Sequence, residues 1–182
     1  MSRNPSMAAE PALVILKRVA AERSLPAPVK ELGSGSEGIV FSTTDPTQVC
    51  RVGTKGQILE LLEWQHSRAV VQVFYVEQME ASDTDGSATM VWVSWQECVD
   101  DNVEGHVYRM FGKGADREKE NRLLGALSAL YHVNARQLKI LKEYEETSYL
   151  AEAIEEGLPV RDLSLESNLG VTADGRVVAY DL

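Results

Sequence analysis

Three polar residues near the end of the chain have the types and the order that a phosphoryl-transfer site requires. Asp162 is followed by Asn168, and a second aspartate, Asp181, comes after a stretch that we expect to form a β-hairpin. One carboxylate can orient an attacking hydroxyl, while the asparagine and the second carboxylate offer the oxygen ligands that Mg²⁺ prefers. Taken singly, each residue is better explained as a turn residue or a strand end. In this order they favour a site, with Asp162 as the catalytic group and the other two as metal ligands.

A glycine-rich segment near the other end of the chain supports that interpretation. Residues 33–40 read GSGSEGIV and match G-x-G-x-x-G-x-V at every fixed position. The motif alone is a weak signal, because glycines also serve in an ordinary tight hairpin. Here it passes from one expected strand into another rather than into a helix, which favours a flap whose backbone amides cover nucleotide phosphates. An acidic residue at its tip, Glu37, counts against phosphate binding. The candidate nucleotide-binding residues are Gly33, Ser34, Gly35, Ser36, Gly38 and Val40.

Arg51 is the candidate cation for the phosphates. It lies on the third expected strand, where its planar guanidinium could bind phosphate oxygens bidentately. The alternative is a solvated arginine on a sheet face. Either Glu60 or Glu63 in the following helix could form an ion pair with Arg51, or both could be solvated. Sequence spacing does not choose between the two glutamates.

The elements that position these residues follow from apolar periodicity and turn residues. The sequences SDTDGS and ADG have strong turn chemistry and predict two hairpins. Residues 97–114 are acidic and contain glycines, so we expect them to form a connector. The expected helices cover 11–23, 55–67 and most of 117–156, and the expected strands cover 29–34, 37–43, 47–52, 70–77, 89–95, 169–171 and 177–180.

Composition excludes several classes of protein. The 182 residues are 44% apolar and carry a formal net charge of −10, which suits a single globular fold and argues against a nucleic-acid binder. Cys50 and Cys98 form no metal-binding or disulfide pattern, so a reducing cytoplasm is the expected location. No apolar run approaches the roughly 18 residues that a membrane span needs, and we expect no membrane association.

Together these residues resemble a eukaryotic-type protein kinase fold, and the size and pattern are closest to the small Ser/Thr kinases of short-tailed lytic bacteriophages. The resemblance implies an α+β fold. A five-stranded antiparallel N-lobe sheet with a helix C would be followed by a reduced, mainly helical C-lobe that ends in a β-hairpin. It divides the chain into an N-terminal tail and docking helix (1–28), an N-lobe (29–96) and a truncated C-lobe (97–182).

The resemblance also implies a role for each candidate residue. Gly33, Gly35 and Gly38 match the glycine-rich loop, Arg51 the strand-three lysine, Glu60 its helix C partner, Gln96 and Glu97 the adenine hinge, Asp162 the catalytic-loop aspartate, Asn168 the metal-binding asparagine and Asp181 the aspartate of the D-F-G element. Asn168 follows Asp162 by six positions, whereas the family pattern has five, so Ser167 is an alternative metal ligand. Further departures are the arginine in place of lysine, Val160 in place of histidine, and the lack of an activation loop after Leu182.

Three functions are consistent with these observations. The first is an active kinase that uses ATP and Mg²⁺ to phosphorylate Ser/Thr hydroxyls of host proteins in the host cytoplasm. The second is a pseudokinase that binds a protein partner without catalysis, and the third is a small-molecule phosphotransferase. We also expect the terminal hairpin to be exposed, which would favour a homodimer, although no heptad pattern supports one.

Overall fold

The chain forms two compact units, one made of the chain up to Leu59 with Gln72–Cys98 and one made of Glu60–Val71 with Val99–Leu182. The computed structural model describes residues 8–35, 38–53, 57–82, 88–112, 116–161, 163 and 168–180. The elements in chain order are α1 (Ala9–Arg23), β1 (Pro28–Gly35), β2 (Gly38–Thr43), β3 (Gln48–Gly53), α2 (Gln57–Glu63), β4 (Val73–Ser82), β5 (Ala88–Glu97), α3 (Val103–Phe111), α4 (Arg117–Ser128), the short 3₁₀ helix η1 (Leu130–His132), α5 (Ala135–Lys142), α6 (Glu145–Glu156), β6 (Leu169–Val171) and β7 (Val177–Ala179).

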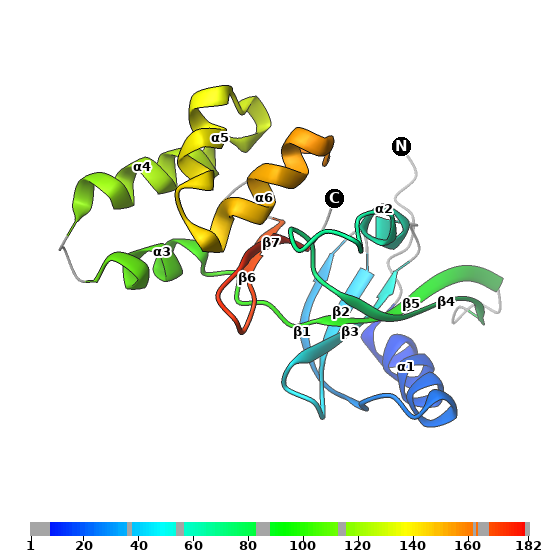
Figure 1. Cartoon of the computed structure of the whole chain (residues 1–182). Coiled ribbons are helices and arrows are strands. Elements are labelled where there is room, and N and C mark those ends of the chain that lie inside the picture. The colour runs from blue at the N-terminus through cyan, green and yellow to red at the C-terminus, as the bar shows by residue number, and fades with distance from the viewer. Residues whose placement is uncertain are drawn as a thin grey trace. The chain divides into compact units, whose positions relative to one another are not determined.

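The first unit contains an antiparallel sheet of five strands in the order β1-β2-β3-β5-β4 (Figure 1). The prediction of a five-stranded antiparallel sheet is therefore confirmed. Strand β4 begins at Val73 rather than at residue 70 as expected. Val70 instead forms a parallel bridge with Ala179, so it belongs to the second unit.

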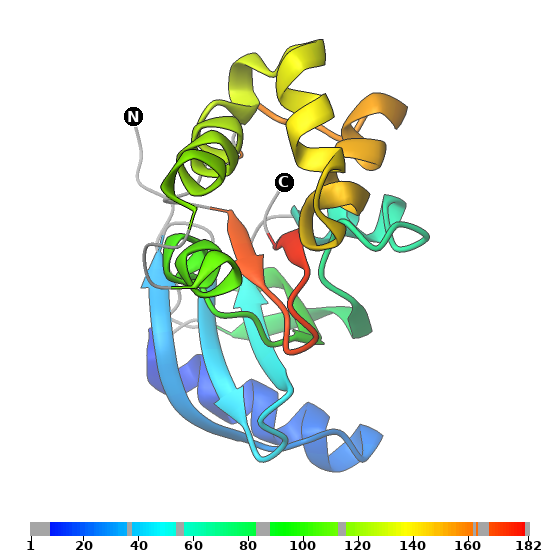
Figure 2. The ribbon, with the colours of Figure 1, turned by 60° about the vertical axis from the view of Figure 1, so that its left-hand side comes forward.

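Helix α1 covers one face of this sheet (Figure 2). Its buried residues are Ala12, Leu16, Val19 and Ala20, which recur at the spacing of one helical stripe. They share a hydrophobic cluster with alternate residues of the central strands, including Phe41, Cys50 and Trp95. The indole Nε1 of Trp95 also donates a hydrogen bond to the carbonyl of Pro26 at 2.8 Å. The expected N-terminal helix is thus part of the core of the first unit.

The second unit contains helices α3 to α6, and α3 was not expected from the sequence. Its polar start is a cap, because the side chain of Asn102 accepts a hydrogen bond from Gly105 N at 2.8 Å. Asn134 and Gln137 form a reciprocal capping box at the start of α5. The expected helical stretch over 117–156 is therefore several short helices with separate caps. Leucines supply much of its buried core: Leu123, Leu127, Leu130, Leu141 and Leu150.

Strands β6 and β7 pair antiparallel in the second unit, and all their residues are buried. Segments from elsewhere in the chain flank both edges. Val70 bridges to Ala179 on the β7 side, and Asp100 bridges to Val171 on the β6 side. The expectation of an exposed hairpin was therefore wrong, because these flanking segments cover strands that sequence alone leaves at the surface. The homodimer loses that support and stays a prediction.

Among the residues with assigned structure, no helix has the length and apolar character needed to cross a bilayer.

Candidate functional site

Three of the candidate nucleotide-binding residues share one face of the sheet. Val40 pairs with Arg51, and Arg51 pairs with Ser94 on β5, so these residues form one row across three strands. Successive side chains of a strand point to opposite faces, and their neighbours Phe41, Cys50 and Trp95 belong to the α1 cluster. The row therefore lies on the face opposite α1. Gln96, two residues after Ser94, lies on that same face.

The glycine-rich segment spans the ends of β1 and β2. Gly35 pairs with Gly38, and Gly33 pairs with Val40. Gly38 has a φ of +154°, and a Cβ there would lie 2.3 Å from the carbonyl oxygen of Val52. Gly33 and Gly35 differ, because nothing lies within 4 Å of a Cβ added at either one. Glycine is thus required by the backbone at position 38, while the fold does not require it at 33 or 35. Ser36 and Glu37 lie outside the described residues.

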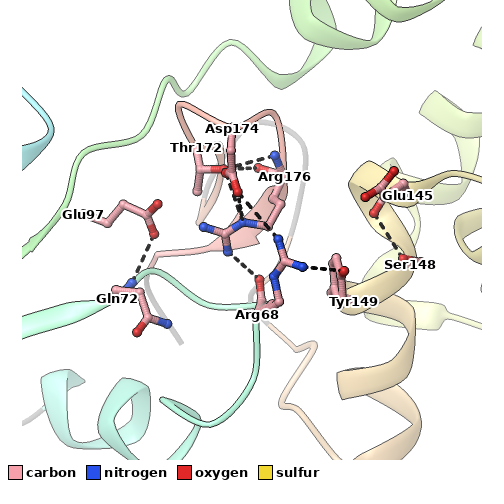
Figure 3. Close-up of polar contacts among 9 residues, drawn as sticks. All are labelled: Arg68, Gln72, Glu97, Glu145, Ser148, Tyr149, Thr172, Asp174 and Arg176. Carbon is pink, nitrogen blue, oxygen red and sulfur yellow. Dashed lines mark hydrogen bonds and ion pairs between the residues drawn. The ribbon is translucent and has the colours of Figure 1, made fainter.

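The two hinge candidates at the end of β5 differ in their surroundings. Gln96 is 5% exposed, and its Nε2 donates a hydrogen bond to Ser94 Oγ at 2.9 Å. The backbone N–H of Glu97 donates to Gln72 O at 2.8 Å, and a carboxylate oxygen of Glu97 accepts from Gln72 N at 3.3 Å (Figure 3). The next amide, that of Cys98, donates to Thr47 O at 2.8 Å. The amides of Glu97 and Cys98 are therefore engaged within the first unit.

Sequence reasoning missed Ser94. It is 2% exposed and lies beside Arg51 in the sheet register. The available signal was a single small polar residue between two tryptophans, in the otherwise apolar run of residues 90–95. A buried hydroxyl needs a hydrogen-bond partner, and Gln96 provides it.

In the second unit, the hairpin register places one metal-ligand candidate, Asn168, opposite Tyr180. Asn168 O accepts a hydrogen bond from Tyr180 N at 3.0 Å, directly before the Leu169–Ala179 pair. Asp181 is the next residue after Tyr180. Asn168 has a φ of 65°, a conformation that asparagine tolerates better than most other residues. Asp181, Asp162 and Ser167 lie outside the described residues, so the choice between Ser167 and Asn168 stays open.

Backbone hydrogen bonds along both edges and close packing at Gly170 hold the hairpin in place. Val71 N donates to Ala179 O at 3.0 Å, and Ala179 N donates to Ala69 O at 2.8 Å. On the other edge, Asp100 and Val171 exchange backbone hydrogen bonds at 2.9 and 2.8 Å. A Cβ at Gly170 would lie 2.7 Å from Val99 Cβ, so no larger residue fits there without a shift.

A polar cluster surrounds the turn of this hairpin (Figure 3). We call it the turn cluster and define it as Arg68, Tyr149, Thr172, Asp174 and Arg176. Arg176 Nε contacts both carboxylate oxygens of Asp174, at 3.0 and 2.9 Å. The hydroxyl of Thr172 donates a hydrogen bond to Asp174 Oδ1. Arg68 contacts both Asp174 and Tyr149, so the cluster joins three parts of the second unit that are distant in sequence.

The hydrogen bond from the Thr172 hydroxyl, together with the guanidinium of Arg176, holds the pKa of Asp174 below its ordinary value of 3.8. The ionised carboxylate therefore stabilises the fold fully above the ordinary pKa, and this contribution is lost as the pH falls through the lower folded-state pKa. We expect Asp174→Asn to lower the melting temperature at pH 6 to 7, and the difference from wild type to shrink below about pH 4. Thermal unfolding of the wild type and Asp174→Asn across this pH range measures the difference in melting temperature. A difference that is constant with pH would show that the charge on Asp174 is not what stabilises the turn.

The remaining candidates are placed as follows. Glu60 and Glu63 are both exposed, and they belong to the second unit whereas Arg51 belongs to the first. Their pairing with Arg51, and the assignment of α2 as helix C, stay predictions.

Burial raises the pKa of the Cys50 thiol to about 12, which makes it unreactive. Within the described part of the chain, no cluster of three or more His, Cys, Asp or Glu side chains could hold a metal ion.

Comparison with known proteins gives a structural match only. No family model matches the chain, and no curated protein sequence matches it. Among solved structures, it matches the MAP kinase LmaMPK10 from Leishmania major with a TM-score of 0.53 and 11% sequence identity. The chain has a protein kinase-like fold. The match covers 94% of this chain and 50% of the MAP kinase, so the chain spans about half the length of that enzyme. The resemblance to bacteriophage kinases stays a prediction.

Proposed function

We propose that this kinase-like chain binds ATP with Mg²⁺ and transfers the γ-phosphoryl group to Ser/Thr hydroxyls of a protein substrate. The observation that carries the proposal is the register of the β6–β7 hairpin. It pairs Asn168 with Tyr180, and Asp181 follows directly. The side chains of asparagine and aspartate offer the oxygen ligands that Mg²⁺ prefers, and Asn168 lies beside the residue that precedes Asp181 in the sequence.

Most of the candidate residues have a part in the proposed reaction. The glycine-rich strand ends and Arg51 would bind the phosphates, and Val40 and Gln96 would contact the base from the same sheet face. Asp162 would accept the proton of the substrate hydroxyl as the hydroxyl oxygen bonds to the γ-phosphorus. The bond between the γ-phosphorus and the β–γ bridging oxygen breaks at the same time, and ADP leaves. Asn168 and Asp181 would hold Mg²⁺, which neutralises charge on the phosphates when bound.

A second candidate function is a pseudokinase that binds a protein partner without catalysis. It is favoured by the hydrogen bonds at the end of β5, because the amides of Glu97 and Cys98 donate to Gln72 and Thr47 and are not available to a base. The arginine at position 51 also favours it, since a guanidinium needs more room beside the phosphates than an ammonium does. Partner, host and location remain predictions under both functions.

A thermal-shift titration with ATP, with and without Mg²⁺, separates the two functions. At ATP concentrations about a hundredfold above Kd, we expect the wild type to gain about 5–10 °C only when Mg²⁺ is present. Arg51→Lys should keep or increase this gain, because a positive charge remains, whereas Arg51→Met should lose most of it. The absence of any shift in the wild type would contradict nucleotide binding and favour the partner-binding function.

Transfer itself is tested with γ-labelled ATP and a mixture of bacterial cytoplasmic proteins, followed by phosphoamino-acid analysis. We expect label on serine and threonine. Binding of ATP without any transfer would leave a nucleotide-binding pseudokinase as the better description.

A further inference from the structure

We propose that the turn cluster is a positioning device for the metal-binding end of the hairpin, with Arg176 as its central residue. This inference rests on the proposed function, because it concerns the Mg²⁺ ligands Asn168 and Asp181. None of the turn-cluster residues would touch the metal or the nucleotide. They would act by fixing the orientation of the strands that carry the ligands.

Arg176 is the most buried charged member of the turn cluster. Its side chain is 12% exposed, and its Nε donates a hydrogen bond that both carboxylate oxygens of Asp174 share. Its Nη1 donates to the carbonyl oxygen of Arg68 at 2.9 Å, across 108 positions of sequence. That carbonyl directly precedes the segment whose residues Ala69 and Val71 pair with Ala179. The guanidinium therefore adds a side-chain hydrogen bond next to the backbone hydrogen bonds that join this segment to Ala179.

Arg68 extends the same connection to helix α6. Its guanidinium lies 3.6 Å from Asp174 Oδ2, hydrogen-bonds the hydroxyl of Tyr149 and stacks over that ring, with 4.2 Å from Cζ to the ring centroid. Figure 3 shows Arg68 between the hairpin turn and Tyr149. Because Arg68 and Asp174 are each 54% exposed, their ion pair alone contributes little to stability. We expect the hydrogen bonds of the less exposed Arg176 to contribute more to the stability of the cluster.

The geometry of the hairpin connects the turn cluster to the ligand end. Three residue pairs separate the turn from Asn168, a length of about 10 Å at the usual rise of a strand. The strands are buried along this length, and Val99 packs against Gly170 in their middle. A short strand pair packed in this way cannot bend freely, so a tilt at the turn moves the ligand end. Loss of the turn cluster should therefore weaken metal binding more than it weakens the fold.

The experiment compares Mg²⁺ titrations at fixed ATP for the wild type, Arg176→Gln and Arg68→Gln, read by thermal shift and calorimetry. The matched control is Arg136→Gln. It removes the same charge from an exposed arginine of the second unit whose side chain forms no hydrogen bond or ion pair with the described residues. The melting temperature without ATP or Mg²⁺ is also measured for all four proteins, because a purely structural defect would lower it and leave the half-saturating Mg²⁺ concentration of the folded protein unchanged.

We expect Arg176→Gln to raise the half-saturating Mg²⁺ concentration by about 3- to 10-fold, below the 10- to 100-fold typical of residues that contact metal ligands directly. Arg68→Gln should have a smaller effect in the same direction, and Arg136→Gln should match the wild type. If Arg176→Gln fails to fold, the milder Arg68→Gln decides. An unchanged Mg²⁺ midpoint in a folded variant overturns the positioning role while the proposed function stands. A wild type without any Mg²⁺-dependent response overturns the proposed function, and this inference with it.

Discussion

Asp181→Asn should abolish Mg²⁺-dependent phosphoryl transfer, with a loss of about a thousandfold or more, while the melting temperature stays within about 2 °C of the wild type. The substitution keeps the size of the side chain and removes its charge. An amide is a much weaker Mg²⁺ ligand than a carboxylate, since the ion prefers charged oxygens. The neighbouring hydrogen bond from Tyr180 N to Asn168 O involves only backbone atoms, so the hairpin register should survive.

Initial rates with γ-labelled ATP and thermal unfolding measure the two halves of this prediction. The control is Asp101→Asn, which removes a charge from an exposed aspartate of the same unit whose carboxylate has no partner in the described part of the chain. It should retain wild-type rates. Full activity in Asp181→Asn would remove Asp181 from the metal site. A large loss of stability would instead indicate a structural role.

Gly38→Ala should destabilise the first unit by about 3 kcal/mol, which lowers the melting temperature of a chain of this size by about 6–12 °C. Two causes act together. The φ of +154° is unfavourable for any residue with a Cβ, and the added carbon would lie 2.3 Å from Val52 O and 2.9 Å from Gly53 Cα. Both contacts are with backbone atoms of β3, so no side-chain rotation relieves them. Calorimetry or circular dichroism during heating measures the loss.

Gly35→Ala is the matched control, because it makes the same chemical change in the same hairpin, at the residue that pairs with Gly38. No atom lies within 4 Å of the added Cβ, and alanine is a better strand residue than glycine. Its melting temperature should equal or slightly exceed that of the wild type. If the hairpin covers phosphates, Gly35→Ala should still weaken ATP binding, whereas an ordinary hairpin predicts no change. Equal stability losses in the two variants would contradict the steric explanation.

These two residues separate two roles that a glycine motif does not distinguish. Gly38 is explained by the fold alone, so its presence says little about nucleotide binding. Gly33 and Gly35 have no steric reason in the described structure to be glycine. They are therefore the more informative part of the motif, and their variants test nucleotide binding without the cost of misfolding.

Local patterns were sufficient for the sheet of the first unit. Alternation along β2, β3 and β5 determines which side chains of each strand share a face, and the strand pairing then brings Val40, Arg51 and Gln96 to the same one. Such patterns were insufficient for α3. Its short amphipathic segment follows acidic residues, and the cap at Asn102 was the available start signal.

The amino-acid sequence by itself determined the strands, most helices, the turn residues and the order of the candidate catalytic and metal-binding groups. These depend on backbone preferences and side-chain periodicity within a few residues. Only the tertiary structure decided that the terminal hairpin is buried, that Val70 bridges to Ala179, that Ser94 lies beside Arg51, and that Arg176 reaches the carbonyl of Arg68. Each of these contacts joins segments far apart in the chain. Their formation depends on which buried surfaces and unpaired backbone groups meet, and no local pattern encodes that choice.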